Sequence, residues 1–222
     1  IKVDTHPYIT TGFRENKFGI PEEQIKKALQ IIKKNQPWLE LQGISAHIGS
    51  QIREISPMLD SAKSLLTTYE SLVRQGVPLK NLDIGGGVGI NYLSEDESDE
   101  LQFLKTYGEG LQSLLKTFPG QLLTEPGRIL VGRSGVLCTR VEYIKDNGFK
   151  NFIVVNSGMN HIMRPSLYKA HHRILPLTPT ESSSMKNFDV VGPICESSDV
   201  LGADRAMKTP KEGDWLAVMD AG

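Results

Sequence analysis

The chain has 222 residues, of which 39% are hydrophobic and 23% are charged. This is the composition of a folded globular protein, and it excludes a disordered tail, a collagen-like chain and a coiled coil. The 25 basic and 26 acidic residues give a net charge of −1, without the basic excess typical of nucleic-acid-binding proteins. No apolar run approaches the roughly 18 residues of a membrane span. We therefore expect a protein that binds neither nucleic acid nor membrane.

The chain contains 2 cysteines, Cys138 and Cys195, without CxxC spacing. This excludes a disulfide framework and a cysteine-based zinc site, and we expect no metal centre. Two thiols fit a reducing compartment, so the expected location is the cytoplasm. Both ends of the chain are expected to be cut, because it opens and closes inside strand-like segments and has no initial Met.

The first half of the chain alternates between short apolar runs and longer runs with helical spacing. The expected elements are a strand at 1–3, a helix from Pro21, and then strand 41–48, helix 57–75, strand 82–84, helix 98–118 and strand 121–124. Strands that alternate with helices of about 15 residues predict a parallel sheet or a βα barrel.

After residue 130 the pattern becomes mostly β. The expected strands are 136–144, 151–155, 173–177, 189–191 and 215–219, with a polar loop at 179–187. Cys138 lies in an alternating strand, where we expect it to pack. The predicted fold is therefore α/β: residues 1–130 form a parallel sheet or part of a βα barrel of the TIM type, and residues 131–222 form a β-rich domain.

Three polar clusters follow strands of the first half, at the ends where βα folds place their active sites. They are His47-Ile-Gly-Ser50-Gln, Gly85-Gly86-Gly87-Val-Gly, and Glu125-Pro126-Gly127-Arg128. Consecutive glycines let backbone N–H groups approach an anion such as a phosphate. His47 is a candidate to stack on a flat ring, Ser50 to reach the phosphate, and Glu125 to pair with a protonated ring nitrogen. Pyridoxal phosphate (PLP) requires this set of contacts.

Each of these residues also has a plain structural interpretation. The glycines could form only a tight turn, His47 could be a buried core histidine, and Glu125 a surface acid. The glycine segment lacks the third glycine of the dinucleotide fingerprint, and no P-loop is present.

The second half adds two clusters. Arg164 and Tyr168 are four residues apart, on one side of a helical turn, and could clamp a carboxylate; the alternative is a surface arginine beside a packed tyrosine. Cys195 lies in a polar turn next to Glu196 and could donate a proton, whereas a lone cysteine is more often an inert buried thiol.

Taken in order, six segments resemble the diaminopimelate decarboxylases, which belong to the alanine-racemase-like, fold type III group of PLP enzymes. The segments are HIGSQ, LDIGGGVGI, TEPGR, MRPSLY, GPICESSD and the closing DAG, and residues 12–19 also match. The resemblance covers nearly the whole chain, and the order of the motifs makes it specific.

The resemblance implies a role for each matching residue. His47 would stack on the cofactor, and Ser50, the three glycines and Arg128 would hold its phosphate. Glu125, in its Glu125-Pro126-Gly127-Arg128 turn, would face the pyridine nitrogen. At the distal end of an amino-acid substrate, Arg128, Arg164 and Tyr168 would hold the carboxylate and Glu196 the ammonium. Cys195 would supply a proton across a homodimer with shared active sites. The implied reaction is decarboxylation of meso-2,6-diaminoheptanedioate (diaminopimelate) to L-lysine.

Three departures from the family pattern stand out. The family's Schiff-base lysine lies upstream of Ile1, its Ala-Tyr-Gly continuation lies beyond Gly222, and His161 replaces a usual aspartate. About four of the eight strands of a βα barrel are represented. We therefore expect this chain alone neither to fold stably nor to catalyse.

Other interpretations stay open at this stage. A related PLP decarboxylase could act on carboxynorspermidine, ornithine or arginine. A non-catalytic PLP-binding protein, or a generic phosphate-binding βα domain, would need neither the Cys195-Glu196 pair nor the Arg164-Tyr168 pair.

Overall fold

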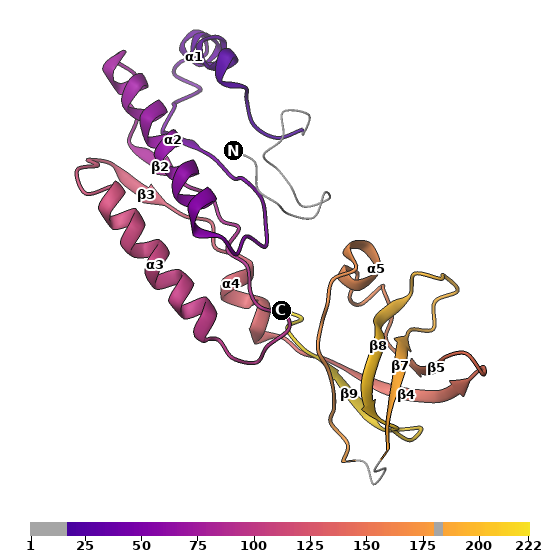
Figure 1. Ribbon diagram of the computed structural model, residues 1–222. Coiled ribbons are helices and arrows are strands. Elements are labelled where there is room, and N and C mark those ends of the chain that lie inside the picture. Colours follow the sequence, from indigo (N-terminus) through magenta and orange to yellow (C-terminus); the bar gives the residue numbers. More distant parts are fainter. Residues whose placement is uncertain (1–16, 180–183) are drawn as a thin grey trace. The chain divides into compact units, whose positions relative to one another are not determined.

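The computed structural model describes residues 17–179 and 184–222, which divide into two compact units (Figure 1). The first unit contains the residues up to Ile90 and Asp96–Ile129, and the second contains Asn91–Glu95 and Leu130–Gly222. The expected α/β class, with a βα part followed by a β-rich part, is confirmed. The strand expected at 1–3 and most of the 12–19 motif lie outside the described residues.

The first unit is a three-stranded parallel sheet with helices in the connections. Its elements are η2 (Glu22–Gln24), α1 (Ile25–Lys34), β1 (Gly43–Ser45), α2 (Ile55–Arg74), β2 (Asn81–Asp83), α3 (Ser98–Leu114) and β3 (Gln121–Leu123). Helices α2 and α3 lie side by side (Figure 1). Met58, Ala62, Tyr69 and Leu72 recur at helical spacing on the buried stripe of α2. Burial of this stripe fixes the helix, and Leu82 of the central strand is fully buried.

The second unit is built on a six-stranded mixed sheet in the order β6-β9-β4-β5-β7-β8. The chain enters it through α4 (Arg128–Val131) and η3 (Gly132–Ser134). Its other elements are β4 (Leu137–Asp146), β5 (Asn151–Val155), α5 (Arg164–Tyr168), β6 (Ile174–Pro176), β7 (Met185–Val191), β8 (Val200–Lys208) and β9 (Trp215–Val218). Alternate strand residues point into one apolar core, where Val141, Phe188 and Leu216 are buried.

Three expectations for the second unit were wrong. The sequence pattern missed β8, whose alternation is interrupted by Gly202 and by Asp204, a residue at positive φ. The loop expected at 179–187 is too long, because β7 already begins at Met185. Cys138 is exposed rather than packed, since Thr139 and Val141 on either side of Arg140 occupy the inward positions of β4.

Candidate functional site

The ends of the three parallel strands of the first unit stay hydrogen-bonded beyond the strands themselves. The Ala46 N–H donates to the Asp83 carbonyl at 3.1 Å. The Ile84 N–H donates to the Leu123 carbonyl at 3.1 Å, and the Glu125 N–H donates to the Gly85 carbonyl at 2.9 Å. These bonds bring the turns after β1, β2 and β3 together at the C-terminal edge of the sheet.

The glycine segment is packed between the other two turns. A Cβ at residue 85 would lie 2.5 Å from the Ala46 carbonyl oxygen. A Cβ at Gly86 would collide with the carbonyl oxygen of Glu125, and one at Gly87 with that of Gly49. Gly85 and Gly87 also have positive φ angles, of 69° and 104°. Space excludes a side chain at all three positions, and at Gly85 and Gly87 the backbone conformation also favours glycine.

Two of the three glycine amides are engaged within the chain. The Gly85 N–H donates to Oδ1 of Asp83 at 2.8 Å, and the Gly86 N–H donates to Nδ1 of His47 at 3.2 Å. The resemblance implies that all three amides bind a phosphate, which stays a prediction. In this structure the first two amides bond to side chains of the same unit, and the Gly87 N–H donates no such bond within residues 17–179 and 184–222.

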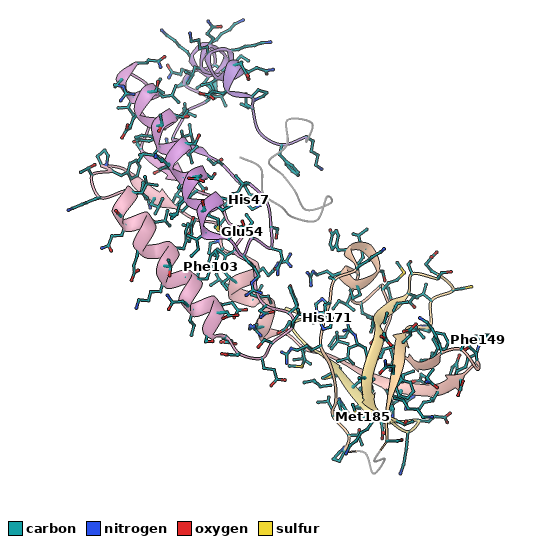
Figure 2. The ribbon with its side chains drawn as sticks, in the orientation of Figure 1. His47, Glu54, Phe103, Phe149, His171 and Met185 are labelled. Carbon is teal, nitrogen blue, oxygen red and sulfur yellow. The ribbon has the colours of Figure 1, made fainter. Side chains whose placement is uncertain are left out.

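Arg128 and Ser50 meet at the same edge of the sheet. Nη2 of Arg128, the first residue of α4, donates to Oγ of Ser50 at 3.3 Å. His47, labelled in Figure 2, follows β1 by two residues, and His47 and Glu125 are both exposed. The structure therefore gathers the backbone of all three expected clusters on one rim, with an imidazole, a carboxyl, a guanidinium and a hydroxyl.

Gln51 also stabilises this rim, and sequence reasoning did not identify it. Gln51 has a positive φ of 62°, and its side-chain amide bonds the backbone of Ile90 in both directions, at 2.6 and 3.3 Å. The GSQ segment gave no signal for this bond, since Ile90 is 39 residues away.

In the second unit, Arg164 and Tyr168 are the first and last residues of α5, as the spacing predicts. The guanidinium of Arg164 contacts His172 and the ring of Tyr92. Sequence reasoning gave these two residues no role. The departure at His161 has a local structural function, because its Nδ1 accepts a hydrogen bond from the Gly158 N–H at 3.4 Å.

The turn that carries Cys195 and Glu196 is organised by Asp199, a second residue that sequence reasoning missed. The Asp199 carboxylate is buried and accepts hydrogen bonds from the N–H groups of Ile194, at 2.8 Å, and Met159, at 2.6 Å. Oε1 of Glu196 accepts from the Ser198 hydroxyl at 3.2 Å. Cys195 itself is exposed. Asp199 thus fixes the backbone while leaving the thiol at the surface of the turn.

Two adjacent histidines carry the perturbed imidazoles of the second unit. Burial lowers the pKa of His172, and the positive charge of Arg164 lowers it further. Burial, followed by the positive charges of Arg205 and Arg173, lowers the pKa of His171. Both rings are therefore held neutral at neutral pH. Among residues 17–179 and 184–222, no group of three or more His, Cys, Asp or Glu side chains could hold a metal ion.

Comparison with known protein families shows which family the chain belongs to. The family model of the pyridoxal-dependent decarboxylases, described as their C-terminal sheet domain, matches residues 9–222. The chain therefore belongs to the pyridoxal-dependent decarboxylases. None of the helices in the described ranges is long and apolar enough to cross a membrane.

Several relatives carry a more specific name. The diaminopimelate decarboxylase of Aquifex aeolicus is 42% identical over 98% of this chain and 51% of its own length. The crystal structure of diaminopimelate decarboxylase from Helicobacter pylori complexed with L-lysine has a TM-score of 0.86 at 38% identity, covering 99% of this chain and 53% of that chain. The M. jannaschii enzyme in complex with L-lysine has a TM-score of 0.84 at 30% identity, over 98% of this chain and 50% of that one. The chain spans about half the length of these relatives.

Proposed function

We propose that this chain is part of a PLP-dependent decarboxylase that converts meso-diaminopimelate to L-lysine, the last step of lysine biosynthesis. The observation that carries the proposal is the convergence of the His47, Gly85–Gly87 and Glu125 turns on one rim of the parallel sheet. The names of relatives that match nearly the whole chain support the choice of substrate.

The residues of the rim fit a phosphorylated pyridine. The side-chain-free backbone of Gly85–Gly87 offers the close approach that a phosphate requires, and the Arg128–Ser50 pair adds a cation and a hydroxyl beside it. His47 offers a flat ring, and Glu125 offers a carboxylate for the pyridine nitrogen, from a turn shaped by Pro126 and Gly127. When bound, PLP supplies an electron sink for the electron pair left behind as carbon dioxide departs.

The second unit would handle the substrate. Arg164 and Tyr168, together with Arg128, would hold the distal carboxylate, because a guanidinium matches the geometry of a carboxylate. Glu196 would accept the distal ammonium. The thiol of Cys195 would give its proton to the α carbon after the bond to the leaving carboxylate breaks. A carboxylate and an ammonium on one distal carbon distinguish diaminopimelate from ornithine and arginine.

The wider architecture forms part of the same proposal. Residues 1–130 would belong to a complete βα barrel and residues 131–222 to a β-rich domain. Two copies of the full-length protein would share active sites, with the Cys195 turn of one copy serving the other. The assembled enzyme would act in the cytoplasm, and this chain alone would be inactive.

Release of carbon dioxide by the full-length protein tests the function. Purified protein loaded with PLP is given diaminopimelate, ornithine, arginine or carboxynorspermidine in parallel. We expect turnover with diaminopimelate and at least about a hundredfold lower kcat/KM with the others, because Arg164 and Arg128 would then lack their carboxylate partner. The Arg164→Ala variant should raise KM strongly and leave the cofactor absorbance intact. Preferential turnover of another amino acid would overturn the assignment, and PLP binding without turnover would favour a binding protein.

A further inference from the structure

Arg164 lies between two residues that its sequence motif does not contain. Its Nη1 is 2.7 Å from Nε2 of His172, and its guanidinium carbon lies 4.4 Å from the centroid of the Tyr92 ring. The rings of Tyr92 and His172 also meet edge to face, with centroids 5.0 Å apart and an interplanar angle of 65°. The three side chains therefore form one contiguous cluster in the second unit.

The hydrogen-bonding chemistry of the cluster fixes the state of His172. A guanidinium is always charged and can only donate, so Nε2 of His172 must accept. The proton of the neutral ring is then on Nδ1, which donates to the Met219 carbonyl at 2.8 Å. His172 is only 1% exposed, so no water competes for these two bonds. Both ring nitrogens are used, and each has a single possible role.

Tyr92 is held by contacts that do not involve Arg164. The flanking carbonyls of Asn91 and Ser94 accept hydrogen bonds from the Arg133 guanidinium at 3.2 and 3.0 Å. Glu95 forms an ion pair with Arg173 at 2.6 Å. The segment Asn91–Glu95 is thereby anchored in the second unit, although its neighbours in sequence belong to the first. The backbone on both sides of Tyr92 is fixed in this way, so its ring presents a preorganised face to the guanidinium.

We propose that His172 and Tyr92 are positioning residues that orient the Arg164 guanidinium toward the distal carboxylate of the substrate. This inference rests on the proposed function, since it assumes that Arg164 binds that carboxylate. His172 accepts a hydrogen bond from one guanidinium N–H and Tyr92 covers a face of the group, so these two contacts fix the plane of the fork. An arginine held in one orientation loses less entropy when it binds a carboxylate.

The test exploits the chemistry of the product. L-Lysine keeps the distal carboxylate of diaminopimelate, and cadaverine is lysine without that group. The ratio of their inhibition constants on the full-length PLP enzyme therefore reports the carboxylate contact alone. In His172→Phe, which keeps an aromatic ring but removes the acceptor, we expect lysine to bind about tenfold more weakly and cadaverine to bind as before. In His172→Gln, which can restore an acceptor, the lysine affinity should return to within about threefold of the original.

Two further variants separate a specific effect on Arg164 from a general loss of folding. Tyr92→Leu should weaken lysine binding about two- to tenfold through loss of the ring face. His171→Phe is the matched control, because this adjacent half-buried histidine contacts Arg205 and not Arg164, and it should leave the ratio unchanged. The inference is overturned if Arg164→Ala abolishes the preference for lysine over cadaverine while His172→Phe and Tyr92→Leu retain it. If the unmodified enzyme neither consumes diaminopimelate nor prefers lysine, the proposed function itself fails.

Discussion

The backbone N–H of Gly86 donates a hydrogen bond to Nδ1 of His47 at 3.2 Å. Because a backbone N–H can only donate, Nδ1 must carry a lone pair, and the proton of the neutral ring is on Nε2. Gly86 also packs directly against the Glu125 carbonyl. One glycine thus sets the ring orientation of the histidine expected to stack on PLP and the spacing of the turn that carries the expected pyridine partner.

The Gly86→Ala substitution should lower the affinity of the full-length protein for PLP by at least about tenfold. The added methyl group has no room beside Glu125, so the turns after β2 and β3 must move apart, a strain of about 1–3 kcal/mol. Titration of the cofactor-free protein with PLP measures this effect. Gly108→Ala in α3 is the control, since a Cβ there meets nothing within 4 Å. Equal affinity in the Gly86 variant would show that the close packing has no bearing on the cofactor.

The Cys195→Ala substitution should lower kcat for decarboxylation by about 10²–10⁴-fold, the usual contribution of a positioned proton donor. Cofactor absorbance should be unchanged, because Cys195 lies in the second unit and the expected PLP contacts lie in the first. Cys138→Ala is a matched control, because this second cysteine is also exposed and lies in β4. A kcat within about twofold of the original would remove Cys195 from the reaction.

The midpoint of thermal unfolding should fall as the pH drops below 6.5. Burial lowers the pKa of both His171 and His172 from the ordinary value of 6.5. The unfolded chain therefore takes up protons that the folded chain does not, and stability is lost from pH 6.5 down to the lowered pKa values. Besides burial, Arg164 and His171 oppose protonation of His172, whereas the Met219 carbonyl and Asp220 favour it, and the net effect is a lowered pKa.

The midpoint of thermal unfolding, followed in the full-length protein between pH 8 and pH 4.5, checks this prediction. His172→Gln removes one of the two titrating groups and should flatten the decline. Glu40 titrates in a separate window, because its hydrogen bond with Lys80 lowers its pKa below the ordinary 4.5. A midpoint that stays constant between pH 6.5 and pH 4.5 would contradict the buried, neutral state of the histidines.

Much of the first unit could be predicted because its signals are local. Helical spacing identified α2, which ends two residues before Gly76, and α3, which ends at Leu114 rather than at the expected residue 118. The triple glycine after β2 indicated a close backbone approach, and the structure has one on each side of it. The partners of the amides could not be foreseen, because the contact between Gly86 and His47 spans 39 residues.

The sequence by itself determined the alternation of elements, the change to β structure near residue 130, the order of the motifs and hence the family. These follow from propensity, spacing and residue chemistry along the chain. Only the tertiary structure decided which face of β4 turns Cys138 outward, that β8 exists despite its irregular pattern, and that Tyr92 meets His172. Such features depend on which distant segments supply the buried surface and the hydrogen-bond partners, and no local pattern carries that information.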